Sequence, residues 1–111
     1  MTGIRSKQRD FAFRLIYVML RSPDLNVERV RLRVKKGGHD VPEPSIRRRW
    51  IRSLEQLPWF LDQADQAAIF DNTGAVPRLV GRKQRGSTII DSDAPIALLQ
   101  ALGLSPPDQK T

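Results

Sequence analysis

The stretch FRLIYVMLRSPDLN, residues 13–26, decides the fold class because a strand pattern passes directly into the start of a helix. Residues 13–20 are apolar apart from Arg14, rich in β-forming side chains and not strictly alternating. This pattern predicts a strand buried on both faces, as in a parallel sheet covered by helices. Ser22 suits the N-cap of a helix, and Pro23 and Asp24 suit its first turn. The order indicates an α/β fold.

The predicted helix continues through LNVERVRLRVKK, residues 25–36, and Gly37 is a natural C-terminal stop. An apolar stripe at helical spacing supports it, formed by Val27, Val30 and Val34. Arg29, Arg33 and Lys36 share another face at spacings of four and three. The helix therefore has one side for packing and one basic side.

A glycine-proline loop, GGHDVPEP at residues 37–44, leads to a second helix that runs to about residue 57. Asp40 and Glu43 have the spacing of a capping box, or else the helix begins at Pro44. Its apolar face consists of Ile46, Trp50, Leu54 and Leu57, with Arg48 and Arg52 on the opposite side. Pro58 is expected to interrupt this helix, with one or two further helical turns after it.

The rest of the chain predicts a second strand at residues 67–72 that ends in an Asn-Thr-Gly turn. PRLVGRK and STIID, residues 77–83 and 87–91, predict two more strands, which form a peripheral hairpin if adjacent. Residues 94–104 predict a last helix, capped by Asp93 and Gly103. We expect one domain over residues 1–104 and a frayed tail over residues 105–111.

Composition narrows the classes of function. The chain has no cysteine, which excludes disulfides, a thiolate zinc site and a thiol nucleophile. A single histidine makes a poor metal site, so no metal site is predicted. No run of about 18 apolar residues occurs, so no bilayer span is expected. The lack of cysteine is compatible with a reducing cytoplasm, and a cytoplasmic location is predicted.

Positive charge is concentrated in the first half. The net charge is +7, and residues 1–57 carry 14 Lys and Arg against 6 Asp and Glu. The remaining residues are close to neutral, with 5 against 6. A basic region of this kind predicts an anionic partner, either nucleic acid, an acidic lipid surface or a phosphorylated small molecule.

Two motifs carry a family resemblance. The first is R-V-x-x-R-V-x-x-G-G-H-D-V-P at residues 29–42, and the second is I-R-R-R-[YW]-x-R-S-L at residues 46–54. In these motifs, and from the strand at residue 13 to IFDNTGAVPRLV, the chain resembles the C-terminal half of zeta-toxin-like P-loop kinases, bacterial members of which are described as ABC-type ATPases. Trp50 stands where that family commonly has tyrosine.

The resemblance implies a partial P-loop NTPase-like fold, with a parallel sheet fragment and a lid-like helical pair. It implies an ATP-binding kinase of a toxin–antitoxin system, and zeta toxins phosphorylate UDP-N-acetylglucosamine. Phosphate or nucleotide contacts are then expected from Arg33, Arg49, Arg52 and Asn72, with Gly37, Gly38 and Asp40 as a hinge loop. Positioned arginines stabilise the charge that spreads over a transferring phosphoryl group.

The chain has no G-x-x-x-x-G-K-[ST] motif, so no Walker A loop is predicted. We therefore expect no kinase or ATPase activity from this chain alone, and a role for ATP and Mg²⁺ only when a P-loop half completes the site. Three explanations fit the missing Walker A loop: a truncated reading frame, a split protein or a degenerate remnant. The strand at residues 13–20 would leave apolar surface and a free edge, so self-association or a Walker A-containing partner chain is expected.

The alternative function is a small basic module that binds nucleic acid through the arginine-rich helix. It has the charge but no recognisable helix-turn-helix, zinc finger or RNA-binding signature.

Individual residues also have structural interpretations. His39 is either a general acid or base or, as we favour, a loop residue bonded near Asp40. Arg33 contacts phosphate or pairs with Glu28 or Asp40. Arg47 and Arg48 are assigned to the surface, and Trp50 and Trp59 to the core or an interface. Asp71 and Asn72 are assigned to a turn that closes a strand, with a nucleotide contact as the alternative.

Overall fold

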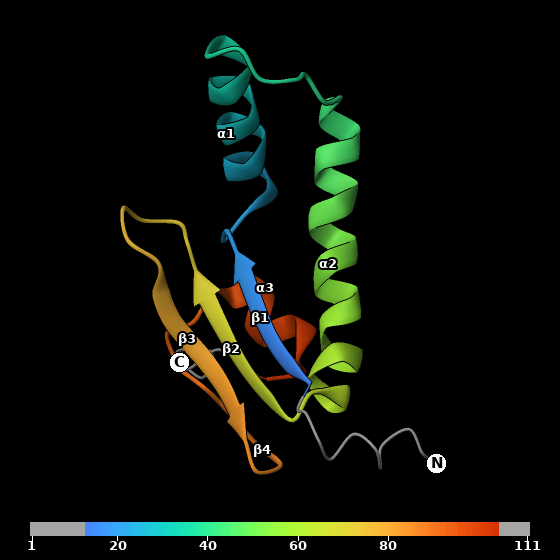
Figure 1. Ribbon diagram of the computed structural model, residues 1–111, viewed down its shortest axis with the longest axis vertical. Helices are drawn as coiled ribbons and strands as arrows, with labels where there is room; N and C mark the ends of the chain where they lie inside the picture. Colours follow the sequence, from blue (N-terminus) through green and yellow to red (C-terminus); the bar gives the residue numbers. More distant parts are fainter. Residues whose placement is uncertain (1–12, 105–111) are drawn as a thin grey trace, which may run out of the picture.

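The computed structural model describes residues 13–104 and shows a mixed α/β chain, which confirms the predicted class (Figure 1). The predicted tail at residues 105–111 lies outside the described residues. The elements in chain order are β1 (Arg14–Met19), α1 (Pro23–Lys35), α2 (Glu43–Gln63), β2 (Gln66–Asp71), β3 (Arg78–Gln84), β4 (Ser87–Ile90) and α3 (Ile96–Ala101).

The four strands form one sheet in the order β1-β2-β3-β4. β1 and β2 are parallel, and the chain crosses between them through α1 and α2. β3 is antiparallel to β2, and β4 is antiparallel to β3, so the predicted hairpin is confirmed. Arg85 and Gly86 form its turn with φ values of 51° and 81°, the positive φ pair that a tight hairpin requires.

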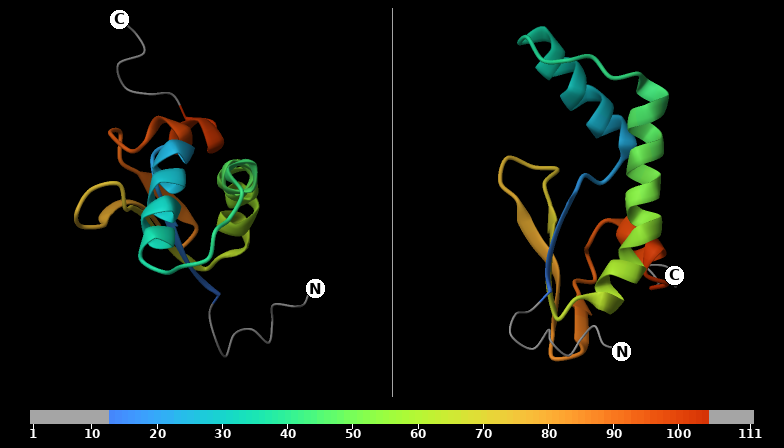
Figure 2. Two further views of the ribbon diagram at one scale, coloured as in Figure 1. Left: turned by 90° about the horizontal axis from the view of Figure 1, so that it is seen from above. Right: turned by 45° about the vertical axis from the view of Figure 1, so that its right-hand side comes forward.

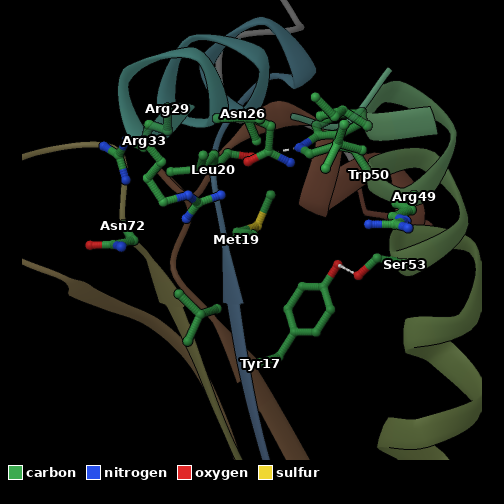
Figure 3. Close-up of a pocket in the computed structure, with 14 residues that line it drawn as sticks. Tyr17, Met19, Leu20, Asn26, Arg29, Arg33, Arg49, Trp50, Ser53 and Asn72 are labelled. Atoms are coloured by element: carbon green, nitrogen blue, oxygen red, sulfur yellow. Dashed lines mark hydrogen bonds between the residues drawn. The ribbon is translucent and has the colours of Figure 1, made fainter. Parts of the chain in front are cut away.

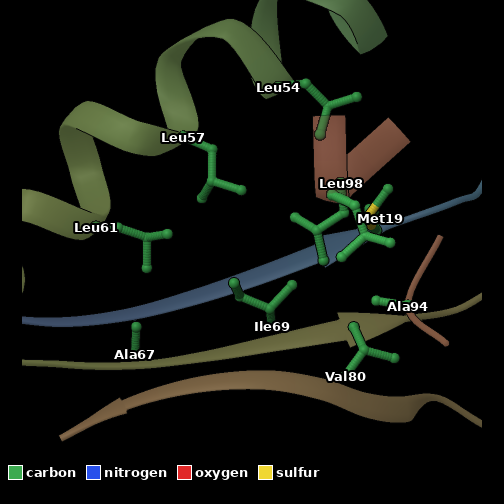
Figure 4. Close-up of a cluster of buried hydrophobic side chains, with 10 residues drawn as sticks. Met19, Leu54, Leu57, Leu61, Ala67, Ile69, Val80, Ala94 and Leu98 are labelled. Carbon is green, nitrogen blue, oxygen red and sulfur yellow. The ribbon is translucent and has the colours of Figure 1, made fainter. Parts of the chain in front are cut away.

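The hydrophobic core lies between the sheet and two of the helices, α2 and α3 (Figure 4). Leu57 on α2, Ile69 on β2 and Leu98 on α3 are at most 1% exposed, so they define its centre. The other buried members are Met19, Leu54, Leu61, Ala67, Val80, Ala94 and Leu99. The predicted apolar face of the second helix therefore packs on the sheet.

The prediction that the first strand is buried on both faces is wrong for the described residues. Along β1, Met19 is buried, whereas Ile16 is 71% exposed and Val18 is 56% exposed. The reason is that α2 and α3 lie on the same side of the sheet (Figure 2, right). The parallel pairing that the apolar run predicted is nevertheless present.

The boundaries of α1 follow its sequence signals. Ser22 occupies the N-cap position with an extended backbone, but its side chain makes no capping hydrogen bond. Gly37 has φ 101° and ends the helix as predicted, and the Gly38 amide donates to the Arg33 carbonyl at 2.8 Å.

The second helix is longer than predicted. It begins at Glu43 with Pro42 at the N-cap, so neither an Asp40 capping box nor a start at Pro44 is correct. It also continues through Pro58 to Gln63, and the predicted interruption is wrong. Leu57 and Leu61 are buried on either side of the exposed Pro58, so packing outweighs the missing backbone hydrogen bond.

The last helix is shorter than predicted. α3 begins at Ile96 with Pro95 at the N-cap, so the predicted Asp93 cap is wrong. The Asp93 carboxylate instead accepts a hydrogen bond from Arg78 Nη1 at 3.3 Å. Gly103 ends the helical segment with φ 75°, as predicted.

The two tryptophans have different surroundings. Trp50 packs against the core, and its indole nitrogen donates to the Leu20 carbonyl at 2.9 Å. Trp59 is 60% exposed and meets the Phe60 ring edge-on at 5.1 Å, so its placement in the core is wrong. Among the helices of residues 13–104, none is both long and apolar enough to cross a membrane.

Candidate functional site

A cleft of about 430 Å³ lies between α1 and α2 at the C-terminal end of β1 (Figure 3). Its charged lining residues are Arg29 and Arg33 from α1 and Arg49 from α2. Its polar lining residues are Tyr17, Asn26, Ser53 and Asn72, and its apolar wall includes Met19, Leu20, Val30, Ile46 and Trp50. In open α/β sheets, ligands bind outside the carboxyl ends of the strands, which is where this cleft opens.

Helical spacing brings the lining residues together. Arg29 and Arg33 are one turn apart on α1, so both side chains reach the same wall of the cleft. On α2, Arg49 and Ser53 are likewise one turn apart. Figure 3 shows Arg33 approaching from above and Arg49 from the side of α2, with the cleft between them.

The lining of this cleft contains no aspartate or glutamate. Arg29 Nη2 donates to the Thr73 carbonyl at 2.9 Å, which ties α1 to the loop after β2. Arg33 and Arg49 form no ion pair with any residue in the range 13–104, so the alternative pairing of Arg33 with Glu28 or Asp40 is wrong there. Two exposed guanidinium groups therefore face a cleft without compensating negative charge.

Tyr17, the tyrosine in the lining, adds no negative charge to the cleft. Ser53 Oγ donates to the Tyr17 hydroxyl at 2.7 Å, which joins α2 to β1. Burial raises the pKa of Tyr17 above its ordinary value of 10.0, and the hydrogen bond from Ser53 lowers it in part. Tyr17 is therefore neutral near pH 7, and the lining carries positive charge only.

Asp71 is a buried acid at the end of β2, for which a turn was the favoured assignment and a nucleotide contact the alternative. It is 4% exposed and accepts hydrogen bonds from the Thr73 amide, at 3.0 Å, and from the Thr73 hydroxyl. The Thr73 hydroxyl in turn accepts from the Arg21 amide at 3.0 Å. Asp71 thus fastens the loop after β1 to the loop after β2 and confirms its structural role. The Asp-Asn-Thr sequence, which favours a side-chain turn, was the available signal.

The structure places some of the predicted site residues in the cleft and others outside it. Arg33, Arg49 and Asn72 line the cleft, whereas Arg52 is exposed on α2 outside it. The loop residues Gly37, Gly38, His39 and Asp40 are exposed between α1 and α2 and do not line it either. Arg29 was missed as a site residue, although its spacing of four from Arg33 places both on one helix face.

Arg47 is not simply a surface residue, as predicted, but a tie between the two helices. Its guanidinium contacts Asp24 Oδ1 of α1 at 2.7 Å and Glu43 Oε2 of α2 at 3.0 Å. These hydrogen bonds, first to Asp24 and then to Glu43, raise the pKa of Arg47. Arg31 adds a second contact from α1 to Glu43 at 2.7 Å. Asp24 and Glu43 are thereby paired with Arg47 and Arg31, and not with Arg33 or Arg49.

Metal ligands are scarce in the part of the chain that the structure describes. Over residues 13–104, no group of three or more His, Cys, Asp or Glu side chains is placed to hold a metal ion. The cleft itself offers hydroxyl and amide oxygens but no carboxylate.

Comparison of the chain with protein-family models, curated proteins and solved structures finds no match. The resemblance to zeta-toxin-like kinases therefore remains a prediction from the two motifs.

Proposed function

We propose that the cleft binds a phosphate-bearing molecule, with Arg33 and Arg49 contacting its phosphate oxygens from opposite walls. The observation that supports this most strongly is the pair of arginines without ion-pair partners in the range 13–104, facing a cleft whose lining has no acid. A guanidinium group donates two parallel hydrogen bonds to phosphate, so two such groups can enclose one phosphate or span two.

The apolar wall suits the body of such a ligand. Trp50 is fixed by its hydrogen bond to the Leu20 carbonyl, and Ile46 and Val30 also line the cleft. Small-molecule sites commonly combine an apolar surface with a few polar groups that set orientation. A nucleotide has both parts, and ATP is the ligand that the family resemblance implies.

The residues fit the phosphates of ATP but do not fit a magnesium ion. Mg²⁺ in phosphate sites is held through carboxylates or loop hydroxyls together with phosphate oxygens, and the cleft lining has no carboxylate. Asp71 is buried and already bonded to Thr73. We therefore propose that this chain supplies arginines and that any magnesium ligands would come from a P-loop half.

On this proposal the chain is the lid-bearing portion of a zeta-toxin-like P-loop kinase that works in the cytoplasm. Its arginines would neutralise charge on the transferring phosphoryl group once a Walker A loop places the nucleotide. The chain alone is expected to release no phosphate from ATP above a buffer blank, because no carboxylate in the cleft can act as the base.

The experiment is calorimetric titration of the full chain with ATP in the presence of a chelator. We expect binding that weakens at least tenfold, about 1.4 kcal/mol, in Arg33→Ala and again in Arg49→Ala. Arg48→Ala is the matched control because Arg48 is exposed on the same helix and bonds only Ser45 among the described side chains. Equal affinity of the wild type, Arg33→Ala and Arg49→Ala would contradict the proposal.

A second candidate function follows from the arginines outside the cleft. Arg48 and Arg52 are exposed one turn apart on α2, as expected of a helix that contacts a nucleic-acid backbone. Binding of a random DNA duplex that falls steeply with salt, and that Arg48→Ala and Arg52→Ala weaken, would support this alternative. Loss of duplex binding in Arg33→Ala alone would not support this alternative, because Arg33 lines the cleft.

A further inference from the structure

The sheet face opposite α2 and α3, here called the open face, is apolar and exposed. Ile16 and Val18 of β1 are 71% and 56% exposed, and Leu79 and Ile89 are 43% and 58% exposed. In Figure 1 the strands lie in front of α3, with this face toward the viewer. A contiguous exposed apolar surface on a soluble domain marks an interaction site.

Strand register arranges these residues in two rows. Val18 lies beside Phe70, which lies beside Leu79. The neighbouring row runs from Ile16 through Ala68 and Arg82 to Ile89. The two rows therefore extend the apolar surface from β1 and β2 to Leu79 on β3 and Ile89 on β4, with Arg82 interrupting the second row.

The pairing of the strands indicates what covers such a surface. Antiparallel sheets commonly leave one face to water, whereas all-parallel sheets occur almost only where helices cover both faces. Ile16, Val18, Ala68 and Phe70 of the open face lie over the parallel pair, β1 and β2, and Leu79 and Ile89 continue the apolar surface onto β3 and β4. The antiparallel side carries polar Gln84 and Ser87 toward its lower end. A helix is therefore the fitting partner element.

Charge distinguishes among helical partners. The charged side chains at the open-face positions of the four described strands are Arg14 and Arg82, with no acid among them. Two copies stacked through this face would bring arginines together around an apolar contact, which is unfavourable. A helix with acidic residues beside its apolar stripe would instead pair with both arginines.

We propose that the open face binds an amphipathic helix of a partner protein, whose apolar stripe lies on β1 and β2 and reaches Leu79 of β3, and whose acidic residues face Arg14 and Arg82. This inference does not rest on the phosphate cleft, because the two surfaces are different and use different residues apart from Val18, which borders both. The mode of recognition is a helix laid on an apolar surface with charged flanks.

The test is selection of helical peptides on the full chain from a displayed library. The library fixes a leucine stripe at helical spacing and randomises the flanking positions among Glu, Lys, Gln and Ser. Counter-selection uses Ile16→Thr/Leu79→Thr, which replaces two apolar side chains with threonine, a polar residue that still favours the strand conformation. Ile51→Thr is the matched control, because Ile51 is 49% exposed on α2. Circular dichroism is used to check that both variants are folded.

We expect enrichment of glutamate at the flanking positions, binding at least tenfold weaker to Ile16→Thr/Leu79→Thr, and unchanged binding to Ile51→Thr. Arg82→Glu should reverse the preference from glutamate to lysine. Selected peptides without acidic enrichment, or peptides that bind the double variant equally, would overturn the proposal. So would a wild-type dimer in sedimentation that Ile16→Thr/Leu79→Thr converts to a monomer, because the face would then be occupied by a second copy.

Discussion

The two halves of α2 lie in opposite surroundings, and the contrast separates what holds the fold from what serves binding. Residues 54–63, here the packed half, place Leu54, Leu57 and Leu61 on the sheet (Figure 4). Residues 43–53, together with α1, form the helix pair, which rises beyond the sheet in Figure 1. There Arg47 is engaged in ion pairs and Arg49 faces the cleft.

The difference shows how one continuous helix performs two tasks. The packed half is held by apolar burial, which is strong and does not depend on charge. The helix pair buries Val27 and Ile46, and it adds exposed ion pairs that contribute little to stability but fix which arginines remain available. A charged cleft is thus attached to a neutral core.

The largest loss of stability is expected from a substitution in the packed half. Leu57→Ala removes a side chain that is 1% exposed, and we expect the free energy of unfolding to fall by about 2–5 kcal/mol. That is a large share of the stability of a domain of this size, so part of the population should unfold. Urea denaturation followed by circular dichroism measures it. A loss below about 1 kcal/mol would show that apolar burial does not hold the packed half more strongly than the helix pair.

A more local effect is expected in the helix pair. Arg47→Ala removes the contacts to Asp24 and Glu43, so α1 should open more often while the core stays closed. Amide hydrogen exchange should therefore become faster in α1 and stay unchanged in β2. Arg48→Ala is the control, because Arg48 lies on the same helix without a contact to α1. Faster exchange in β2 as well would mean that the two halves unfold as one unit.

The smallest expected effect on stability concerns the hydrogen bond between Tyr17 and Ser53, which lies where the two halves of α2 meet. The folded-state pKa of Tyr17 is raised above 10.0, so the folded state holds this proton more tightly than the unfolded state. Its contribution to stability is full below pH 10 and is lost as the pH rises through the folded pKa. Tyr17 is the only tyrosine, so tyrosinate absorbance reports its titration directly.

We expect the absorbance midpoint of the folded chain to lie above that of the urea-unfolded chain. Tyr17→Phe should also lose stability less steeply than the wild type above pH 10. A folded midpoint at or below the unfolded one would show that Tyr17 is not buried against α2.

The order of elements could be predicted because each has a local cause. The apolar run of β1, the Gly37 stop and the Arg85-Gly86 turn each specify a backbone conformation without help from distant residues. Pro58 misled the prediction because the cost of a proline is local, whereas the gain from burying Leu57 and Leu61 depends on the sheet.

The candidate site could be predicted only in part for a similar reason. Helical spacing placed Arg33 on a shared face with Arg29, but only the packing of α1 on α2 decides which arginines of α2 meet them. Arg47, Arg49 and Arg52 look alike in sequence. In the structure one ties the helices together, one lines the cleft and one is exposed outside it.

The most direct measurement is a residue-resolved NMR titration of the full chain with tripolyphosphate, which tests the proposed phosphate cleft without a base or a metal. We predict that the largest amide shifts fall on Arg33, Arg49, Leu20 and Asn72 and that they saturate. They should disappear in Arg33→Ala/Arg49→Ala and persist in Arg48→Ala. Shifts centred on Arg48 and Arg52, with the cleft unchanged, would contradict the account and favour a nucleic-acid surface.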